Sequence, residues 1–231
     1  MYIFFFICVA GIIAVIPLHF LSVEHLKLEE KYGQDRGRQI GRIYSFLSGW
    51  GLFVFWAGLW VSPQPRFIIP FFLNLSVVFP FINYSIPIVH LIVFVPLFLL
   101  GAWFGVAGVK GTTLKVAETH RADKIVTSGV YSLVRHPQYL GGLLAHVGIT
   151  FLFSAWYSLL STPLMILLIF LISKKEENEL TNEFGKEYQD YAEKVPMFFP
   201  RIKKYHRYPQ LLVLQYLEHM LYKQKPNSKI C

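Results

Sequence analysis

The chain has 231 residues, of which 54% are hydrophobic, 17% are aromatic and only 16% are charged. Soluble domains usually carry about 25% charged residues, so this composition excludes an ordinary soluble protein and indicates an integral membrane protein. The net charge is +8, but the placement of the basic residues matters more than their number, and we expect no nucleic-acid partner. Cys8 and Cys231 offer neither a disulfide framework nor metal-ligand spacing, so we expect no metal site.

Five long apolar runs predict transmembrane helices, because about 20 apolar residues cross the hydrocarbon core. The first run lacks the basic start and small-residue cleavage site of a secretory signal, so we expect it to be retained. The last two runs would form a C-terminal helical hairpin, which returns the chain to the side that it left. The sequence thus predicts an all-α membrane protein, with spans in residues 2–21, 41–61, 86–107, 138–156 and 157–173.

The basic residues predict the orientation of these spans. Except for Arg66, they all lie in the segments 24–42 and 110–135 or after residue 173. Cytoplasmic loops of membrane proteins collect Lys and Arg. We therefore expect these three segments to face the cytoplasm and the N-terminus to lie outside.

A sixth candidate run, residues 66–82, is interrupted by Pro70 and Pro80. If the three basic segments share one side, this run cannot cross the membrane. We expect a re-entrant or interfacial segment on the outer side. The alternative, a sixth span, would place Arg135 outside. Within the third span, Gly101 and Gly105 form a G-x-x-x-G pair, which favours tight helix packing over close approach of a cofactor.

A polar cluster stands at the start of the fourth run. Pro137 suits the first position of a helix, because it lacks the N–H that would have no partner there. A helix from Gln138 would turn free backbone N–H groups and a positive dipole end toward the membrane boundary, which suits a carboxylate or phosphate. Arg135 adds a permanently charged donor fork, His136 adds a ring that can donate or accept a hydrogen bond, and Tyr139 offers a ring and a hydroxyl. Each alone has a structural explanation, but the combination indicates a site.

Two carboxylates, Glu176 and Glu177, follow the last apolar run. A carboxylate so close to hydrocarbon is costly unless it is solvated or paired. A structural partner would be Lys174, Lys175 or Arg135. A functional partner would be the ribose hydroxyls or amino group of a nucleotide-like cofactor, and position alone does not choose between the two. The hairpin would bring this pair to the membrane face that holds the polar cluster.

The next segment predicts an amphipathic helix. Its apolar residues recur at helical spacing and would form one face, while the other face is charged. Pro196 would end the helix. We expect it to lie on the cytoplasmic surface with its apolar face anchored in the membrane, although that face would also suit the roof of a site. The face consists of Leu180, Phe184, Tyr188, Tyr191 and Val195.

Three histidines, His19, His90 and His146, lie in or near the spans. No H-E-x-x-H motif and no His/Cys cluster accompanies them, so packing roles are favoured, although His146 would also suit a cavity wall. The sequence has no P-loop and no G-x-G-x-x-G motif, so a Rossmann-type nucleotide site is not supported.

The C-terminal half, from about residue 124 to 201, resembles the isoprenylcysteine carboxyl methyltransferase family and the wider group of phospholipid and related membrane methyltransferases. The first hundred residues are similar only in being membrane spans. The motifs that carry the resemblance are Arg135-His136-Pro137-Gln138-Tyr139-Leu140-Gly141, Glu176-Glu177, Glu183-Phe184-Gly185-Lys186-Glu187-Tyr188 and Val195-Pro196.

The resemblance implies S-adenosylmethionine as a methyl donor held at the cytoplasmic face. By motif, His136, Tyr139, Glu176 and Glu177 would contact the cofactor, and Val126 would offer backbone contacts. Arg135 would orient an anionic acceptor, and His136 would accept a proton from an amine or thiol. We expect a single membrane domain over 1–231, with N-terminal spans to residue 107, a methyltransferase-like region at 108–201 and a basic tail at 202–231.

The resemblance also implies membrane lipids as surroundings and a lipophilic or prenylated acceptor entering between helices. Some carboxyl-methylating relatives carry Arg four residues before the acidic pair, where this chain has Ile172. The acceptor therefore stays open among a prenylcysteine carboxylate, a phospholipid amine and a hydrophobic thiol. An NADPH-dependent sterol-type reductase and a non-catalytic scaffold are the alternatives, and the sequence does not give the oligomeric state.

Overall fold

The computed structural model of the chain describes residues 2–69, 75–79, 84–113, 116, 119–122 and 124–200. Its long helices are α1 (Ile3–Val23), α3 (Gln34–Val61), α4 (Ile88–Thr112), α6 (Pro137–Leu152) and α7 (Trp156–Phe184). The smaller elements are α2 (His25–Tyr32), β1 (Ser76–Phe79), β2 (Tyr84–Pro87), the 3-10 turn η1 (Gly129–Ser132) and α8 (Lys186–Lys194). The predicted basic tail at 202–231 lies outside the described residues.

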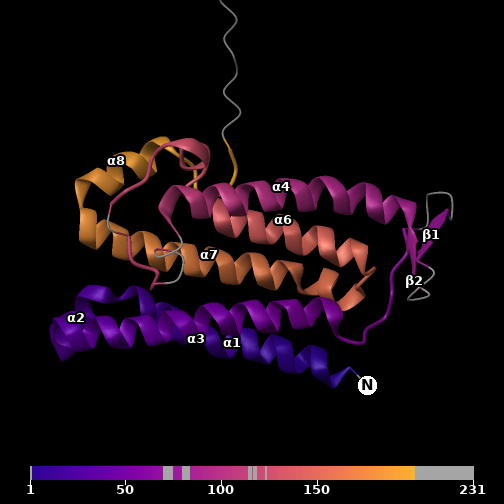
Figure 1. Ribbon diagram of the computed structural model, residues 1–231, viewed down its shortest axis with the longest axis horizontal. Helices are drawn as coiled ribbons and strands as arrows, with labels where there is room; N and C mark the ends of the chain where they lie inside the picture. The colour runs from indigo at the N-terminus through magenta and orange to yellow at the C-terminus, as the bar shows by residue number, and fades with distance from the viewer. Residues whose placement is uncertain are drawn as a thin grey trace, which may run out of the picture. The chain divides into compact units, whose positions relative to one another are not determined.

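The long helices run side by side as an antiparallel bundle (Figure 1). One layer is the pair α1 and α3, the other contains α4 and α6, and α7 contacts α1, α3 and α6. The helices α2 and α8 lie at one end of the bundle, and the strands β1 and β2 lie at the opposite end. We call these the α8 end and the hairpin end.

The chain is a multi-pass membrane protein. Helices α1, α3, α4 and α7 are each long and apolar enough to cross a membrane. The fifth predicted span is α6, whose 16 residues rise about 24 Å, less than the roughly 30 Å of a hydrocarbon core. Large apolar side chains point outward from the bundle, as a lipid-facing surface requires, among them Phe46, Trp50, Leu99, Trp103 and Leu167.

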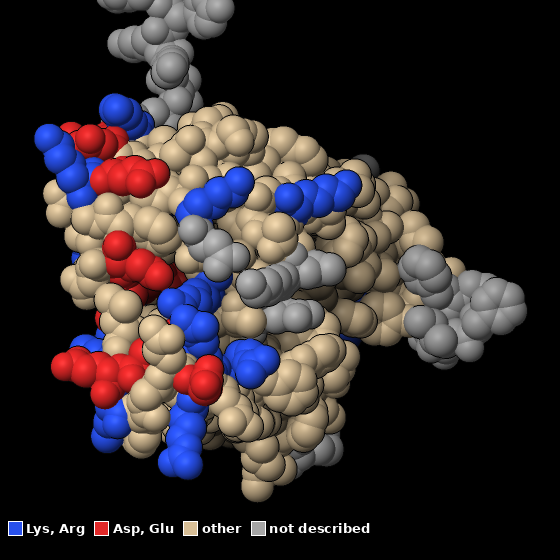
Figure 2. All heavy atoms as spheres, turned by 60° about the vertical axis from the view of Figure 1, so that its left-hand side comes forward, with Lys and Arg blue, Asp and Glu red and all other residues tan. Residues whose placement is uncertain are grey.

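Charged side chains gather at the α8 end. Apart from Arg66, those of the described residues belong to α2 and the preceding Glu24, to the adjoining ends of α3, α4 and α7, to the segment before α6, and to α8 with its flanks. Figure 2 shows acidic and basic side chains interspersed over this end. The contrast with the apolar remainder matches a boundary between water and hydrocarbon.

The described part of the segment 66–82 is not a span. Its strand β1 pairs antiparallel with β2, so that Ser76 lies opposite Pro87. Arg66 holds the hairpin, because its Nη2 donates to Ser85 O at 2.5 Å and its guanidinium lies 4.3 Å from the centre of the Tyr84 ring. The third predicted span therefore begins later than expected, after the strand.

Helix α7 corrects the predicted end of the last span. We expected the helix to stop at residue 173, but it continues to Phe184 and includes both glutamates. Polarity ends an apolar run without ending a helix, and the extension is supported by an i,i+4 ion pair of 2.9 Å between Lys175 and Glu179. Gly185, with φ of 57°, ends the helix in a conformation that favours glycine.

Helix α8 corrects a second expectation. Its apolar face was expected to anchor in the membrane, yet Tyr188, Tyr191 and Val195 are buried against protein. They form a core cluster with Ile125, Leu180 and other apolar residues. The predicted helix through residues 180–195 is divided at Gly185, so that Leu180 and Phe184 belong to α7. The apolar face of α8 packs against the chain itself, so α8 covers the bundle end instead of lying on the membrane surface.

Glycines bring the backbones of α4 and α6 into contact. A Cβ added to Gly101 would lie 2.7 Å from Gly141 O, and one added to Gly141 would lie 2.5 Å from Gly101 O. This agrees with the packing interpretation of the G-x-x-x-G pair. The close approach fixes the position of α6, and with it the polar residues at its start.

We predict that Gly101→Ala destabilises the protein by about 1–3 kcal/mol, because the added methyl group collides with backbone atoms that cannot turn away. Gly105→Ala is the matched control, since a Cβ at Gly105 meets nothing within 4 Å. Thermal unfolding in detergent would measure both. Equal stability of the two variants would contradict the proposed contact.

Candidate functional site

A cavity of about 380 Å³ opens at the α8 end. Its polar wall comes from α1, the segment before α6, the first turn of α6, and α7. Its apolar wall includes Leu52, Phe53 and Trp56 of α3. Among the residues predicted from the sequence, the cavity is lined by Val126, Arg135, His136, Tyr139 and Glu176.

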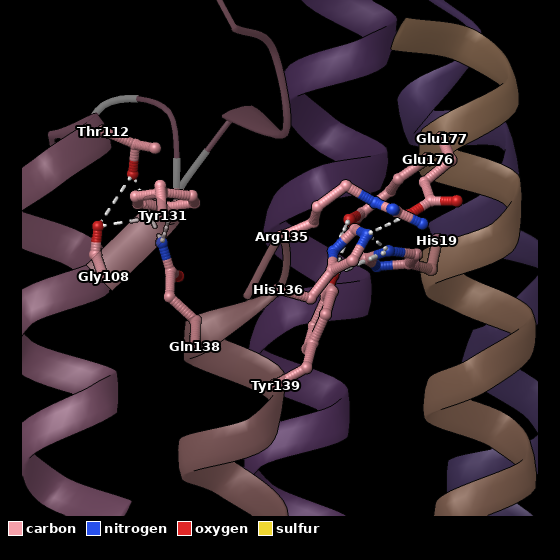
Figure 3. Close-up of polar contacts among 10 residues, drawn as sticks. All are labelled: His19, Gly108, Thr112, Tyr131, Arg135, His136, Gln138, Tyr139, Glu176 and Glu177. Atoms are coloured by element: carbon pink, nitrogen blue, oxygen red, sulfur yellow. Dashed lines mark hydrogen bonds and ion pairs between the residues drawn. The ribbon is translucent and has the colours of Figure 1, made fainter. Parts of the chain in front are cut away.

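Glu176 is the carboxylate that faces this cavity. Its Oε1 accepts hydrogen bonds from the Tyr139 hydroxyl and from His19 Nε2, the latter at 3.2 Å. Its Oε2 lies 3.6 Å from His136 Nδ1, beyond hydrogen-bond distance. Figure 3 shows these side chains converging from α1, α6 and α7. One oxygen of Glu176 is thus held by the protein, and the other stays available as an acceptor.

Glu177 lies behind the cavity wall. It is 6% exposed, and it is not among the residues that line the cavity. Its Oε1 accepts from Arg135 Nε at 2.6 Å and from His136 Nε2 at 3.2 Å. The two glutamates that looked equivalent in the sequence therefore differ: Glu176 faces the cavity, and Glu177 accepts hydrogen bonds from Arg135 and His136.

Arg135 joins the site to α8. Its Nη1 donates to Ala192 O at 2.7 Å and to Val195 O at 2.5 Å, carbonyls at the end of α8 that have no partner farther along the helix. The backbone N–H of Arg135 also donates to Pro196 O at 2.9 Å. The expected role of orienting an anionic acceptor stays a prediction, but Nε and Nη1 are already bonded to protein atoms.

His136 and Tyr139 present parallel faces to one another. Their ring centres are 5.8 Å apart and their planes differ by 25°. His136 precedes Pro137, the first residue of α6, so both rings are placed by the first turn of that helix. The start of α6 therefore borders the cavity, as the sequence predicted.

A second network holds the opposite wall. Gln138 Nε2 donates to Thr112 Oγ1 at 3.2 Å and to the Tyr131 hydroxyl at 3.3 Å, as Figure 3 shows. The Tyr191 hydroxyl donates to Tyr131 O at 2.7 Å. Burial raises the pKa of the Tyr131 hydroxyl, which stays protonated and able to donate. Val126 packs beside Tyr131 in this wall.

Two histidines that were not predicted as site residues, His19 and His120, also reach the site. His19 was assigned a packing role, yet it contacts Glu176 and lines the cavity. His120 lies against it, with ring centres 4.4 Å apart. Burial lowers the pKa of His120 to about 4, so its imidazole is neutral near pH 7. The sequence feature that could have indicated this role is the position of His19 near the C-terminal end of the first span, at the membrane boundary.

The other two histidines have packing roles, as expected. His146 Nδ1 accepts from the indole N–H groups of Trp56 at 2.8 Å and Trp60 at 3.0 Å. His90 lies near the hairpin end, where its Nδ1 is 2.9 Å from Ser154 Oγ. Neither residue lines the cavity.

Comparison with known proteins identifies a family model, described as phospholipid methyltransferase, that matches residues 88–187. The probable protein-S-isoprenylcysteine O-methyltransferase of Oryza sativa subsp. indica is 39% identical over 93 residues, which are 38% of this chain and 48% of the relative. The protein-S-isoprenylcysteine O-methyltransferase of Schizosaccharomyces pombe is 31% identical over 99 residues, 42% of this chain and 41% of the relative.

A methanethiol S-methyltransferase of Bradyrhizobium diazoefficiens is 38% identical over 78 residues, 32% of this chain and 27% of the relative. The chain thus spans about half the length of the plant relatives that it matches, and less of the bacterial one. No solved structure matches the chain.

We predict that Arg135→Lys loosens α8, because an ammonium group cannot replace the guanidinium bonds to Glu177, Ala192 O and Val195 O together. Backbone amides of residues 186–195 should exchange with deuterium about tenfold faster or more, as expected from losing hydrogen bonds to charged groups. Arg38→Lys, at a half-exposed position of α3, is the control. Unchanged exchange in Arg135→Lys would contradict the clamp.

Proposed function

We propose that this chain, whose residues 88–187 match the phospholipid methyltransferase family, transfers the methyl group of S-adenosylmethionine to a lipophilic acceptor. The single observation that carries the proposal is the convergence of His136, Tyr139 and Glu176 on one cavity at the α8 end. The matched family supports a methyltransferase over the NADPH-dependent reductase that the sequence left open.

The chemistry of the cavity wall fits this donor. The free Oε2 of Glu176 suits an ammonium group or ribose hydroxyls, which donate hydrogen bonds. The start of α6 and the ammonium group of Lys124, which also lines the cavity, suit a carboxylate. A cavity of about 380 Å³ lies within the roughly 300–1,000 Å³ of small-molecule sites.

When bound, S-adenosylmethionine would supply a methyl group on a sulfonium, which an acceptor takes by in-line displacement. The residues of the chain would act mainly by positioning, which can lower a barrier by several kcal/mol. A carboxylate acceptor needs no base, whereas an amine or thiol must lose a proton. His136 is the candidate to accept that proton. Its ring nitrogens lie 3.2 Å from Glu177 and 3.6 Å from Glu176, and these carboxylates would stabilise the imidazolium that forms.

For the acceptor, we propose first a prenylcysteine-type carboxylate. The relatives named as isoprenylcysteine O-methyltransferases support it, and so does the apolar wall of Leu52, Phe53 and Trp56, which would accommodate a hydrocarbon chain. Ile172 is buried at the position where some relatives carry Arg. An acceptor carboxylate would therefore not meet an arginine at this position of the chain. The relative named methanethiol S-methyltransferase supports a thiol as the second candidate.

The test is incubation of purified protein in lipid with methyl-labelled S-adenosylmethionine and, separately, a farnesylated cysteine, phosphatidylethanolamine and a hydrophobic thiol. We expect label in a base-labile ester of the first acceptor. Label in the aminophospholipid or thioether alone would keep the methyltransferase and replace the acceptor. Absence of label with all three acceptors and with a host lipid extract would overturn the proposal.

We predict that Glu176→Gln lowers the affinity for S-adenosylmethionine about tenfold or more, because it removes a charged acceptor facing the cavity. Glu187→Gln, which removes a carboxylate from the exposed side of α8, should bind normally. Calorimetry on both proteins is the measurement. Wild-type affinity in Glu176→Gln would exclude this carboxylate from the donor site.

We propose that the α8 end faces the cytoplasm, because the basic residues gather there. Single cysteines at Ser128 and Asn182, both exposed, should react with an impermeant thiol reagent only from the cytoplasmic side. A cysteine at Ser76, at the hairpin end, should react only from the other side. The native cysteines should not interfere, because Cys231 is replaced in these variants and Cys8 is only 2% exposed. Labelling of the cysteines at positions 128 and 182 from the outside would contradict the proposed orientation.

A further inference from the structure

We propose that His19 is a positioning residue of the methyl-donor site, which holds the Glu176 carboxylate in its cavity-facing orientation. The inference rests on the proposed function and adds a part to it. His19 belongs to α1, whereas the family model matches only residues 88–187. The donor site would therefore be completed by the N-terminal half of the chain.

The contact geometry supports this assignment. His19 Nε2 lies 3.2 Å from Glu176 Oε1 and 3.5 Å from the Tyr139 hydroxyl oxygen. Its side chain is 2% exposed and still borders the cavity. A carboxylate only accepts hydrogen bonds, so Nε2 must carry the proton in this contact. With Tyr139, His19 gives Glu176 Oε1 two donors, as Figure 3 shows.

His19 is itself held in place by its neighbours. The ring of His120 lies 4.4 Å away, centre to centre. His120 Nδ1 is 2.8 Å from Ser22 Oγ, and its carbonyl oxygen is 2.9 Å from His25 Nε2. These contacts tie the ring beside His19 to α1 and α2. The rotamer of His19 is therefore supported by surrounding structure, which a positioning role requires.

Packing of α1 does not by itself account for a histidine here. The helix is held to α3 and α7 by an apolar cluster that includes Phe5, Cys8 and Ile12 with Leu59 and Met165. A buried polar ring is costly unless its atoms are paired. Among the described residues, His19 Nδ1 has no hydrogen-bond partner. The Nε2 contact with Glu176 is thus the interaction that offsets burial of this ring.

The physical effect would be on affinity for the donor. A carboxylate that can rotate must be ordered when a ligand binds, and it points part of the time away from the cavity. Two donors on Oε1 remove that freedom in advance and leave Oε2 for the ammonium group or ribose hydroxyls of the ligand. Because His19 acts through Glu176, its loss should weaken donor binding more than it slows transfer at saturation.

The test compares His19→Phe, which keeps a ring but loses the donor, with His19→Gln, whose amide N–H replaces Nε2. We expect His19→Phe to weaken S-adenosylmethionine binding about ten- to a hundredfold by calorimetry, the range for loss of a hydrogen bond to a charged group. His19→Gln should recover most of this loss. In assays, the KM for the donor should rise in His19→Phe while kcat changes by less than about threefold.

His90→Phe is the matched control, because it replaces a fully buried histidine near the hairpin end. It should change stability without changing donor affinity. A lower kcat at constant KM in this variant would indicate that less of the protein is folded. Wild-type affinity in His19→Phe would overturn the inference, and so would a His19→Gln variant as weak as His19→Phe. Failure of the unmodified protein to bind S-adenosylmethionine would instead overturn the proposed function together with this part of it.

Discussion

The ion pair between Arg135 and Glu177, on which the α8 end depends, joins three parts of the chain at one point. Arg135 precedes α6, Glu177 belongs to α7, and the other donors of Arg135 reach the end of α8. Both side chains are almost buried, 12% and 8% exposed. Removing one partner of such a pair leaves an uncompensated charge, which is far more destabilising than the net worth of the pair. The interaction therefore enforces one arrangement of the three segments around the cavity.

The rest of the site follows from that arrangement and from the close contact between the glycines of α4 and α6. Gly101 and Gly141 let α4 and α6 touch, which sets the height and rotation of α6. His136 and Tyr139 then lie on the first turn, one beside Glu177 and the other beside Glu176. The adjacent glutamates point in different directions, because residues next to each other on a helix are about 100° apart. One carboxylate thus binds Arg135 and His136, while its neighbour faces the cavity.

Much of this arrangement was predictable from the sequence, because its signals are local or follow from burial. Apolar length identified the long helices, Pro137 marked the start of α6, and a hairpin of α6 and α7 necessarily brought His136 near the glutamates. The predicted end of α7 was wrong, because hydropathy indicates where the membrane ends and not where the helix ends. The predicted environment of the apolar face of α8 was also wrong, because helical periodicity shows that a face is buried without showing whether lipid or protein buries it.

His19 illustrates a limit of a different kind. Its contact with Glu176 joins residues 157 positions apart in the chain, and no motif surrounds it. The family match likewise stops at residues 88–187, whereas the cavity takes His19 from α1 and Leu52, Phe53 and Trp56 from α3. The wall that would meet an acceptor thus comes from helices outside the matched region. Relatives can share the matched region and still differ in these N-terminal helices, so the acceptor has to be established on this chain itself.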